Sequence, residues 1–113
     1  MFDFFNRNSL AYKVRHIKKQ IKGVSTQYSR EKVWISQIGA YDINPKHLSF
    51  TICVKTDKEK RRLQDDSQLN HELRQILVDN GYPVDAIYEV KIGFESQETV
   101  DRESNGSWYY HFK

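Results

Sequence analysis

The order of the elements expected along this chain predicts an α+β fold, a two-layer sandwich of helices on an antiparallel sheet. Stretches with a helical apolar period alternate with stretches of strand-like alternation, in the order helix, strand, strand, helix, strand, strand. Short turns join the strands into hairpins, which gives about four antiparallel strands with both helices on one face. A chain of 113 residues with 38% hydrophobic side chains is expected to form one domain, residues 1–113, around one modest core.

The first helix is predicted to begin near Asn8 or Ser9, either of which can cap its free backbone N–H groups. Gly23 is expected to end it. Its apolar residues recur at the spacing of one helical face: Leu10, Val14, Ile17 and Ile21.

Two strands are expected next. The segment VWISQIGAYD, residues 33–42, is rich in β-branched and aromatic side chains, and Pro45 then favours a turn. The segment HLSFTICVK, residues 47–55, alternates apolar and polar side chains, which predicts a strand buried on one face. Its inward residues are Leu48, Phe50, Ile52 and Val54.

Residues 56–66 are ambiguous, because Thr56 and Glu59 have the spacing of a helix cap but Leu63 is the only apolar side chain. We expect an exposed loop or a frayed helical turn there. A clearer helix follows from Asp66 or Ser67, and Gly81 is expected to end it in a left-handed conformation.

The last two expected strands form a closing hairpin. In the segment AIYEVKIGF, residues 86–94, alternate side chains including Ala86, Tyr88 and Phe94 point inward. The segment WYYHFK, residues 108–113, alternates again, and Asn105-Gly106 before it is a strong signal for a two-residue hairpin turn.

Several functional classes have no support in the sequence. No apolar run is long enough to cross a bilayer, the start of the chain lacks a secretory pattern, and Cys53 is the only cysteine. A cytoplasmic protein without an internal disulfide is therefore expected, with Cys53 as a half-buried thiol. The four histidines stand on separate predicted elements: His16, His47, His71 and His111.

That histidine spacing fits no helical zinc motif, although a zinc site assembled from distant residues stays open. No glycine-rich phosphate loop and no nucleophile elbow occurs. We expect no enzyme, no catalytic residue, no metal and no cofactor.

Charge is unevenly distributed around a net value of +3. Residues 1–22 carry six basic side chains against Asp3, whereas residues 85–103 carry six carboxylates against Lys91 and Arg102. The chain is thus expected to have a positive N-terminal end and a negative C-terminal end.

The predicted closing hairpin sets acids beside aromatic rings. Pairing outward from Asn105-Gly106 places Glu103 opposite Trp108 and Asp101 opposite Tyr110. A core cannot hold unpaired carboxylates, so either a bulge shifts the register, or these acids mark where the face meets solvent, or basic groups neutralise them. One interpretation is a hairpin whose acids are solvated. The other is that cations of a partner protein neutralise them. The partner-binding residues predicted on this basis are Glu95, Glu98, Asp101, Glu103, Trp108 and Tyr109.

The N-terminal helix offers the opposite charge. Its basic residues can contact phosphates or form an ordinary solvated face; they are Lys13, Arg15, Lys18, Lys19 and Lys22, with His16 beside them. The preceding MFDFF segment is expected to pack on the domain through Phe2, Phe4 and Phe5, or to contact a partner or a second copy.

Three segments resemble the small immunity proteins of bacterial toxin systems, including those of contact-dependent growth inhibition. They are LNHELRQILVDNGYP, VKIGFESQETVDRE and NGSWYYHFK, which together span residues 69–113, with HLSFTICVKTD as a fitting strand before them. The resemblance implies a bacterial, non-catalytic protein, monomeric or dimeric, that binds a cognate toxin domain and blocks it. A small nucleic-acid-associated protein that uses the basic helix is the alternative, and an enzyme of a type not apparent from the sequence is the third reading.

Overall fold

The computed structural model describes residues 2–113, and describes side chains from Leu10 onward. Its elements in chain order are α1 (Phe2–Tyr28), β1 (Trp34–Ile38), the short 3-10 helix η1 (Pro45–His47), β2 (Ser49–Val54), α2 (Asp57–Gln64), α3 (Ser67–Asp79), β3 (Lys91–Ser96), α4 (Gln97–Ser104) and α5 (Trp108–Phe112). The α+β class is confirmed. The packing expected of Phe2, Phe4 and Phe5 lies outside the described side chains.

The described part of the chain forms a three-stranded mixed sheet in the order β1-β2-β3, so the prediction of four antiparallel strands is wrong. Strand β1 runs antiparallel to β2, with Trp34 opposite Cys53. Strand β3 runs parallel to β2, with Ser49 opposite Lys91. A parallel pair needs a long crossover rather than a hairpin, and α2 with α3 supplies it between β2 and β3.

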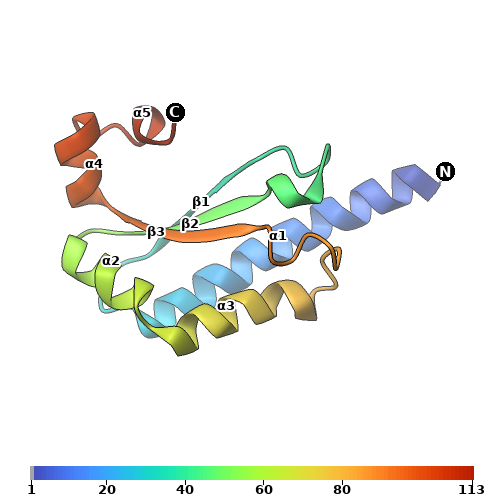
Figure 1. The fold of residues 1–113 in the computed structure, drawn as a ribbon, viewed down its shortest axis with the longest axis horizontal. Helices are drawn as coiled ribbons and strands as arrows, with labels where there is room; N and C mark the ends of the chain where they lie inside the picture. The colour runs from blue at the N-terminus through green and yellow to red at the C-terminus, as the bar shows by residue number, and fades with distance from the viewer. Residues whose placement is uncertain (1) are drawn as a thin grey trace.

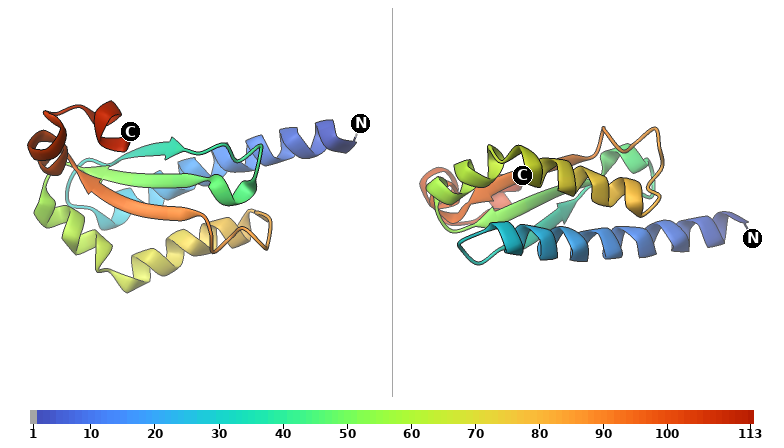
Figure 2. Two further views of the ribbon diagram at one scale, coloured as in Figure 1. Left: turned by 45° about the horizontal axis from the view of Figure 1, so that its top comes forward. Right: turned by 90° about the horizontal axis from the view of Figure 1, so that it is seen from below.

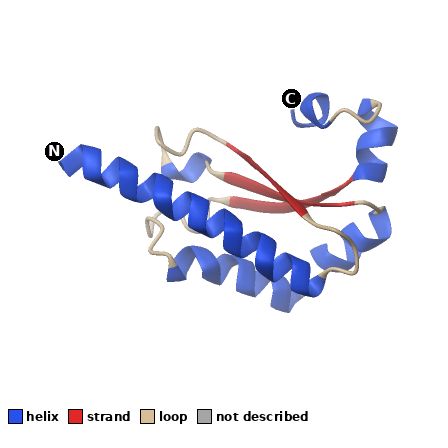
Figure 3. Ribbon diagram, turned by 180° about the vertical axis from the view of Figure 1, so that it is seen from behind, coloured by secondary structure: helices blue, strands red, loops and turns tan. Residues whose placement is uncertain are grey.

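Helices α1 and α3 lie side by side against one face of the sheet (Figures 1 and 3). The apolar stripe predicted for α1 is confirmed, because Val14, Ile17 and Ile21 are fully buried. They join a core with the inward residues of β2 and the apolar face of α3: Phe50, Ile52, Val54, Leu69, Leu73 and Leu77. Burial of these side chains holds the two layers together.

Helix α1 does not end at Gly23 but continues to Tyr28. Its apolar face extends past the glycine, since Val24 and Tyr28 pack against the core. A glycine inside a helix costs only about 1 kcal/mol relative to alanine, and this packing offsets it. The Tyr28 hydroxyl also donates to the Glu72 carboxylate on α3, a hydrogen bond that raises the pKa of Tyr28 to about 12.

Residues 57–64 form helix α2 rather than a loop. The Thr56 hydroxyl caps it by accepting from the backbone N–H of Glu59. Helix α2 buries Leu63 together with Glu59, a charged side chain. An apolar count misses such a helix because half of its buried face is polar.

The prediction of a closing hairpin is wrong, and so is the prediction of a strand at residues 108–113. Strand β3 ends at Ser96, whose hydroxyl accepts from the N–H of Thr99 and so starts α4. Asn105 and Gly106 do have positive φ, at 50° and 81°, but they end α4 instead of closing a hairpin. Positive φ serves a helix C-terminus as well as a hairpin turn, and the sequence alone does not distinguish the two uses.

The strand predicted for residues 86–94 begins only at Lys91. Residues 84–89 form turns, and Tyr88 is 80% exposed rather than inward. The end of α3 follows the prediction, because Gly81 has a φ of 67°.

Helices α4 and α5 fold back at one end of the sheet, on the opposite side from α1 and α3 (Figures 1 and 2). Trp108 of α5 packs edge-on against Trp34 of β1, with 5.3 Å between ring centroids. Helices are therefore not confined to one face. Cys53, which the register places on the same face as Trp34, is fully buried instead of half-buried. No helix within residues 2–113 combines the length and the apolar character that a bilayer crossing requires.

Candidate functional site

The acidic residues predicted as a partner surface are dispersed in the fold. Glu95 on β3 lies 2.8 Å from Lys60 Nζ and 2.7 Å from His111 Nε2. Burial alone raises the pKa of Glu95, but the hydrogen bonds from Lys60 and His111 outweigh burial and lower it. This carboxylate is neutralised within the molecule.

The remaining predicted acids lie on α4. Glu98 accepts from the backbone N–H of Asp57 at 2.7 Å, and Asp101 accepts from the side chain of Gln97 at 2.9 Å. Glu98, Asp101 and Glu103 are all exposed. That they bind a partner stays a prediction, since the hairpin that placed them beside the aromatic rings is absent.

The two predicted aromatic residues have different surroundings. Trp108 is half-buried, and its indole N–H donates to the Gln97 side chain at 2.7 Å. Tyr109 is 70% exposed. Of this pair, only Tyr109 presents most of its ring to the surface.

A cluster of paired charges at the junction of α2, β3 and α4 was not predicted. Asp57 accepts from Ser96 and Thr99 and pairs with Arg102 at 2.6 Å, and these contacts hold its pKa well below the usual range. Glu59 is buried and pairs with Arg62 at 2.7 Å. The capping spacing of Thr56 and Glu59 was the one sequence signal for this cluster.

Ser104, His111 and Glu95 form a hydroxyl–imidazole–carboxylate chain, with Ser104 Oγ 3.1 Å from His111 Nδ1. Nucleophilic catalysis also needs backbone N–H groups free to stabilise an oxyanion. The N–H of Gly106 donates to Val100 and that of Ser107 donates to Ser104. The amides beside the hydroxyl are thus engaged, and the contacts favour a structural network. Among the described side chains, residues 10–113, no three metal-ligating groups gather into a site.

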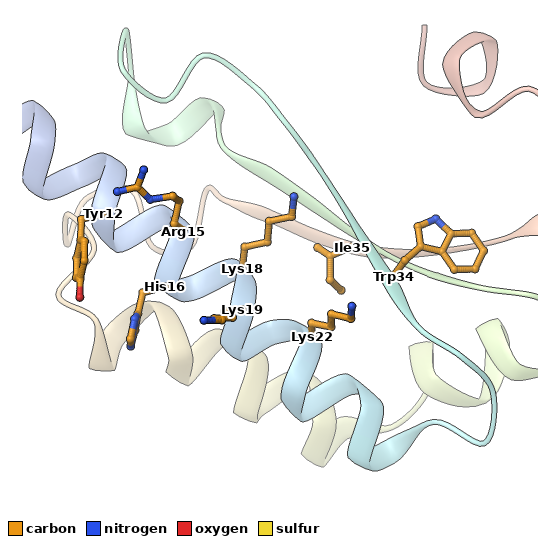
Figure 4. A pocket seen from close by; sticks show the side chains of 8 residues that line it. All are labelled: Tyr12, Arg15, His16, Lys18, Lys19, Lys22, Trp34 and Ile35. Atoms are coloured by element: carbon orange, nitrogen blue, oxygen red, sulfur yellow. The ribbon is translucent and has the colours of Figure 1, made fainter.

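Four cations gather in a groove between α1 and the edge strand β1, shown in Figure 4. The groove has a volume of about 750 Å³. We call it the basic groove; it is lined by Tyr12, Arg15, His16, Lys18, Lys19, Lys22, Trp34 and Ile35. In Figure 4, Lys18 and Lys22 extend from α1 on the side of the helix that faces β1.

Helical spacing puts four cations on this wall. Arg15, Lys18, Lys19 and Lys22 recur at three- and four-residue steps, so they share one face of α1 that flanks the buried stripe. Residues 10–28 contain no carboxylate. Among the side chains described, residues 10–113, none of the four cations forms an ion pair.

Lys13, the fifth basic residue predicted for this helix, lies elsewhere. Its ammonium donates to the carbonyl of Gly81 at 3.2 Å, just beyond the C-terminus of α3. A cation is stabilised near a helix C-terminus, where carbonyl groups point outward. The fold therefore assigns Lys13 to the contact between α1 and the end of α3.

A second groove of about 550 Å³ adjoins the basic groove and shares Trp34 and Ile35 with it. We call it the aromatic surface; its lining is Trp34, Ile35, Ser36, Ile38, Trp108, Tyr109, Phe112 and Lys113. Sequence reasoning did not connect β1 with the C-terminal aromatic residues, because only the fold brings these segments together. Among the described side chains, residues 10–113, no Asp or Glu lines either groove.

No family model matches this chain, and neither the curated proteins nor the solved structures contain a significant match. Its function is therefore inferred from the geometry of these surfaces.

Proposed function

We propose that this protein binds nucleic acid, and that the basic groove between α1 and β1 contacts its phosphate backbone. The observation that supports this proposal is the set of four unpaired cations on one wall of the groove, with no carboxylate in its lining. Like charges held together repel one another, and an anionic ligand relieves that repulsion.

The dimensions fit a short stretch of backbone. Arg15 and Lys22 are seven residues apart, so the basic wall is about 10 Å long at about 1.5 Å per residue. That length spans about three nucleotides at a rise of about 3.4 Å each. Contacts of this kind are sequence-independent and release bound counterions, so the affinity falls steeply with salt.

The lining favours a nucleic acid over a simple anion. Ile35 of β1 lies on the side of the strand that faces the cations, whereas the Trp34 ring turns from the same edge toward Trp108 (Figure 4). Tyr12 and His16 extend the lining along α1. Aromatic rings beside a row of cations suit a ligand with both phosphates and bases. An acidic protein segment would pair with the cations, but it has no bases to stack on the aromatic rings.

Charge reversal in the groove tests this proposal. The variant Lys18→Glu with Lys19→Glu removes two phosphate contacts and adds repulsion, and we expect its affinity for a fluorescent oligonucleotide to fall about tenfold or more. Fluorescence anisotropy is the measurement. The slope of log K against log salt is expected near −3 for four contacts with a single strand, and flatter in the variant.

The control is Lys58→Glu with Arg61→Glu, which makes the same charge change at exposed cations of α2 outside both grooves. We expect its affinity to stay close to that of the unaltered protein. Equal losses in both double variants point to net charge alone and contradict a site in the groove.

A second function is favoured by a different observation. Glu98, Asp101 and Glu103 lie exposed on α4, and the exposed Tyr109 follows on α5. We propose, as the lesser alternative, that this acidic helix docks on a basic toxin domain in the manner of an immunity protein. Asp101→Lys with Glu103→Lys is expected to abolish co-purification with such a toxin, and undiminished capture rules out this helix as the contact.

A further inference from the structure

We propose that the ligand is single-stranded and that its bases stack on the aromatic surface while its backbone follows the basic groove. This inference rests on the proposed function and adds the strandedness of the nucleic acid and the place of its bases. The geometry that points to it is the edge strand β1, whose Trp34 and Ile35 line both grooves. A strand that leaves the basic groove on the α1 side reaches the aromatic surface on the α5 side by passing around this edge.

The aromatic surface is held in place by the fold. Trp108 packs edge-on against Trp34 and lies 5.7 Å from the ring of Phe112. Its indole N–H is fixed by Gln97 on α4. Rings with few rotatable bonds and fixed neighbours lose little freedom when a base stacks on them.

Two features of this surface remain accessible to a ligand, although Tyr110 packs edge-on against the Tyr109 ring with 5.3 Å between centroids. Tyr109 lies in its lining yet is 70% exposed. Lys113 also lines it, with its ammonium 5.7 Å from the centre of the Tyr109 ring. An exposed ring with a neighbouring cation offers stacking and charge to one nucleotide.

The neighbouring sheet face leaves room for a ligand. Across the three strands, its middle row carries Ser36, Thr51 and Gly93, which are small side chains or none. A Cβ added to Gly93 meets no atom within 4 Å. The face is therefore shallow beyond α5, and bases that leave the groove can reach it.

A duplex cannot use this surface, because its base faces are stacked inside the helix and only edges and phosphates are accessible. A single strand can expose base faces and phosphates together. A basic groove that leads to an aromatic surface therefore favours a single-stranded ligand over a duplex.

Intrinsic fluorescence provides a direct test, since Trp34 and Trp108 are the chain's two tryptophans and both line the aromatic surface. An oligothymidylate of about 12 nucleotides, within the size range of single-strand sites, is compared with a duplex of the same length and with heparin. We expect the single strand to quench tryptophan emission, and heparin, which has no bases, to bind without quenching.

The matched variants are Tyr109→Ala and Tyr88→Ala. Both tyrosines are exposed, at 70% and 80%, but Tyr109 lines the aromatic surface and Tyr88 lines neither groove. Tyr109→Ala is expected to weaken oligothymidylate binding about fivefold or more and to leave heparin binding unchanged, whereas Tyr88→Ala is expected to have little effect on either.

The outcomes separate the two proposals. If oligothymidylate and duplex bind equally, without quenching and without loss in Tyr109→Ala, base stacking is wrong while phosphate binding in the groove stands. If Lys18→Glu with Lys19→Glu leaves binding of both probes unchanged, the groove itself is wrong. Selective binding of the single strand, with quenching and loss in Tyr109→Ala only, supports the inference.

Discussion

The basic groove and the junction of α2, β3 and α4 are both rich in charge, but they arrange it in opposite ways. In the groove, four cations share one wall without a carboxylate in the lining. At the junction, three carboxylates each form an ion pair: Asp57 with Arg102, Glu59 with Arg62, and Glu95 with Lys60. We call these six residues the paired cluster.

This difference separates charges that stabilise the fold from charges that remain available. The carboxylates of the paired cluster are mostly shielded from solvent. The Lys60–Glu95 and Arg102–Asp57 pairs connect elements distant in sequence, whereas Glu59–Arg62 lies within α2. The groove cations are mostly exposed, and their side chains form no ion pair among the described residues, 10–113. Changing the paired cluster should therefore cost stability, whereas changing the groove should cost binding.

The largest expected effect is the loss of Glu59. Its carboxylate accepts from the backbone N–H of Arg30, the hydroxyl of Ser29 and the guanidinium of Arg62. Glu59→Ala removes the carboxylate acceptor of the Arg30 N–H and the ion-pair partner of Arg62, while Ser29 and Arg62 keep the carbonyls of Glu31 and Tyr28. We expect unfolding in urea to show a loss of about 3 kcal/mol. The control Glu103→Ala removes an exposed carboxylate and is expected to change stability by less than about 0.5 kcal/mol. Comparable losses in both variants contradict the distinction.

Acid is expected to act on the paired cluster alone. Hydrogen bonds from Arg62 lower the pKa of Glu59 from 4.5 to about 2, and the pKa values of Asp57 and Glu95 are also lowered. A carboxyl group with a lowered folded-state pKa contributes stability that is present above its unfolded pKa and is lost as pH falls through the folded pKa.

Thermal melts should therefore show declining stability between about pH 4.5 and pH 2, and a shallower decline in Glu59→Ala. Lysine and arginine stay protonated over this range, so the groove variant Lys18→Gln with Lys22→Gln should show the same decline as the unaltered protein. An unaltered pH profile in Glu59→Ala would show that this carboxylate has no part in acid unfolding.

The smallest expected effect has the opposite sign. Lys18→Glu replaces repulsion of Lys22, four residues on, by attraction, and it also faces Arg15 three residues before. We expect the free energy of unfolding to rise by about 0.5 kcal/mol while nucleic-acid binding weakens. Thermal melting at low salt is the measurement, with Lys58→Glu as the control on α2. A loss of stability in Lys18→Glu would mean that Lys18 makes a stabilising contact.

Local patterns predicted the elements that make the core. The stripe of Val14, Ile17 and Ile21, the alternation around Phe50, and the second helix with its cap at Asp66 all occur as expected. These patterns succeed because each depends on one buried face of one element. The cations of the groove were also visible in the sequence, since helical spacing alone places Lys18, Lys19 and Lys22 on an outer face.

The sequence by itself determined that this chain is α+β, that β2 is a core strand, and that α1 carries positive charge mostly off its buried stripe. Only the tertiary structure decided that Asn105 and Gly106 end a helix, that Glu95 is neutralised by Lys60, and that Trp34 meets Trp108. The physical reason is one of range. Periodicity and capping depend on residues a few positions apart, whereas ion pairing, strand direction and the joining of two grooves depend on residues brought together by the crossover between β2 and β3.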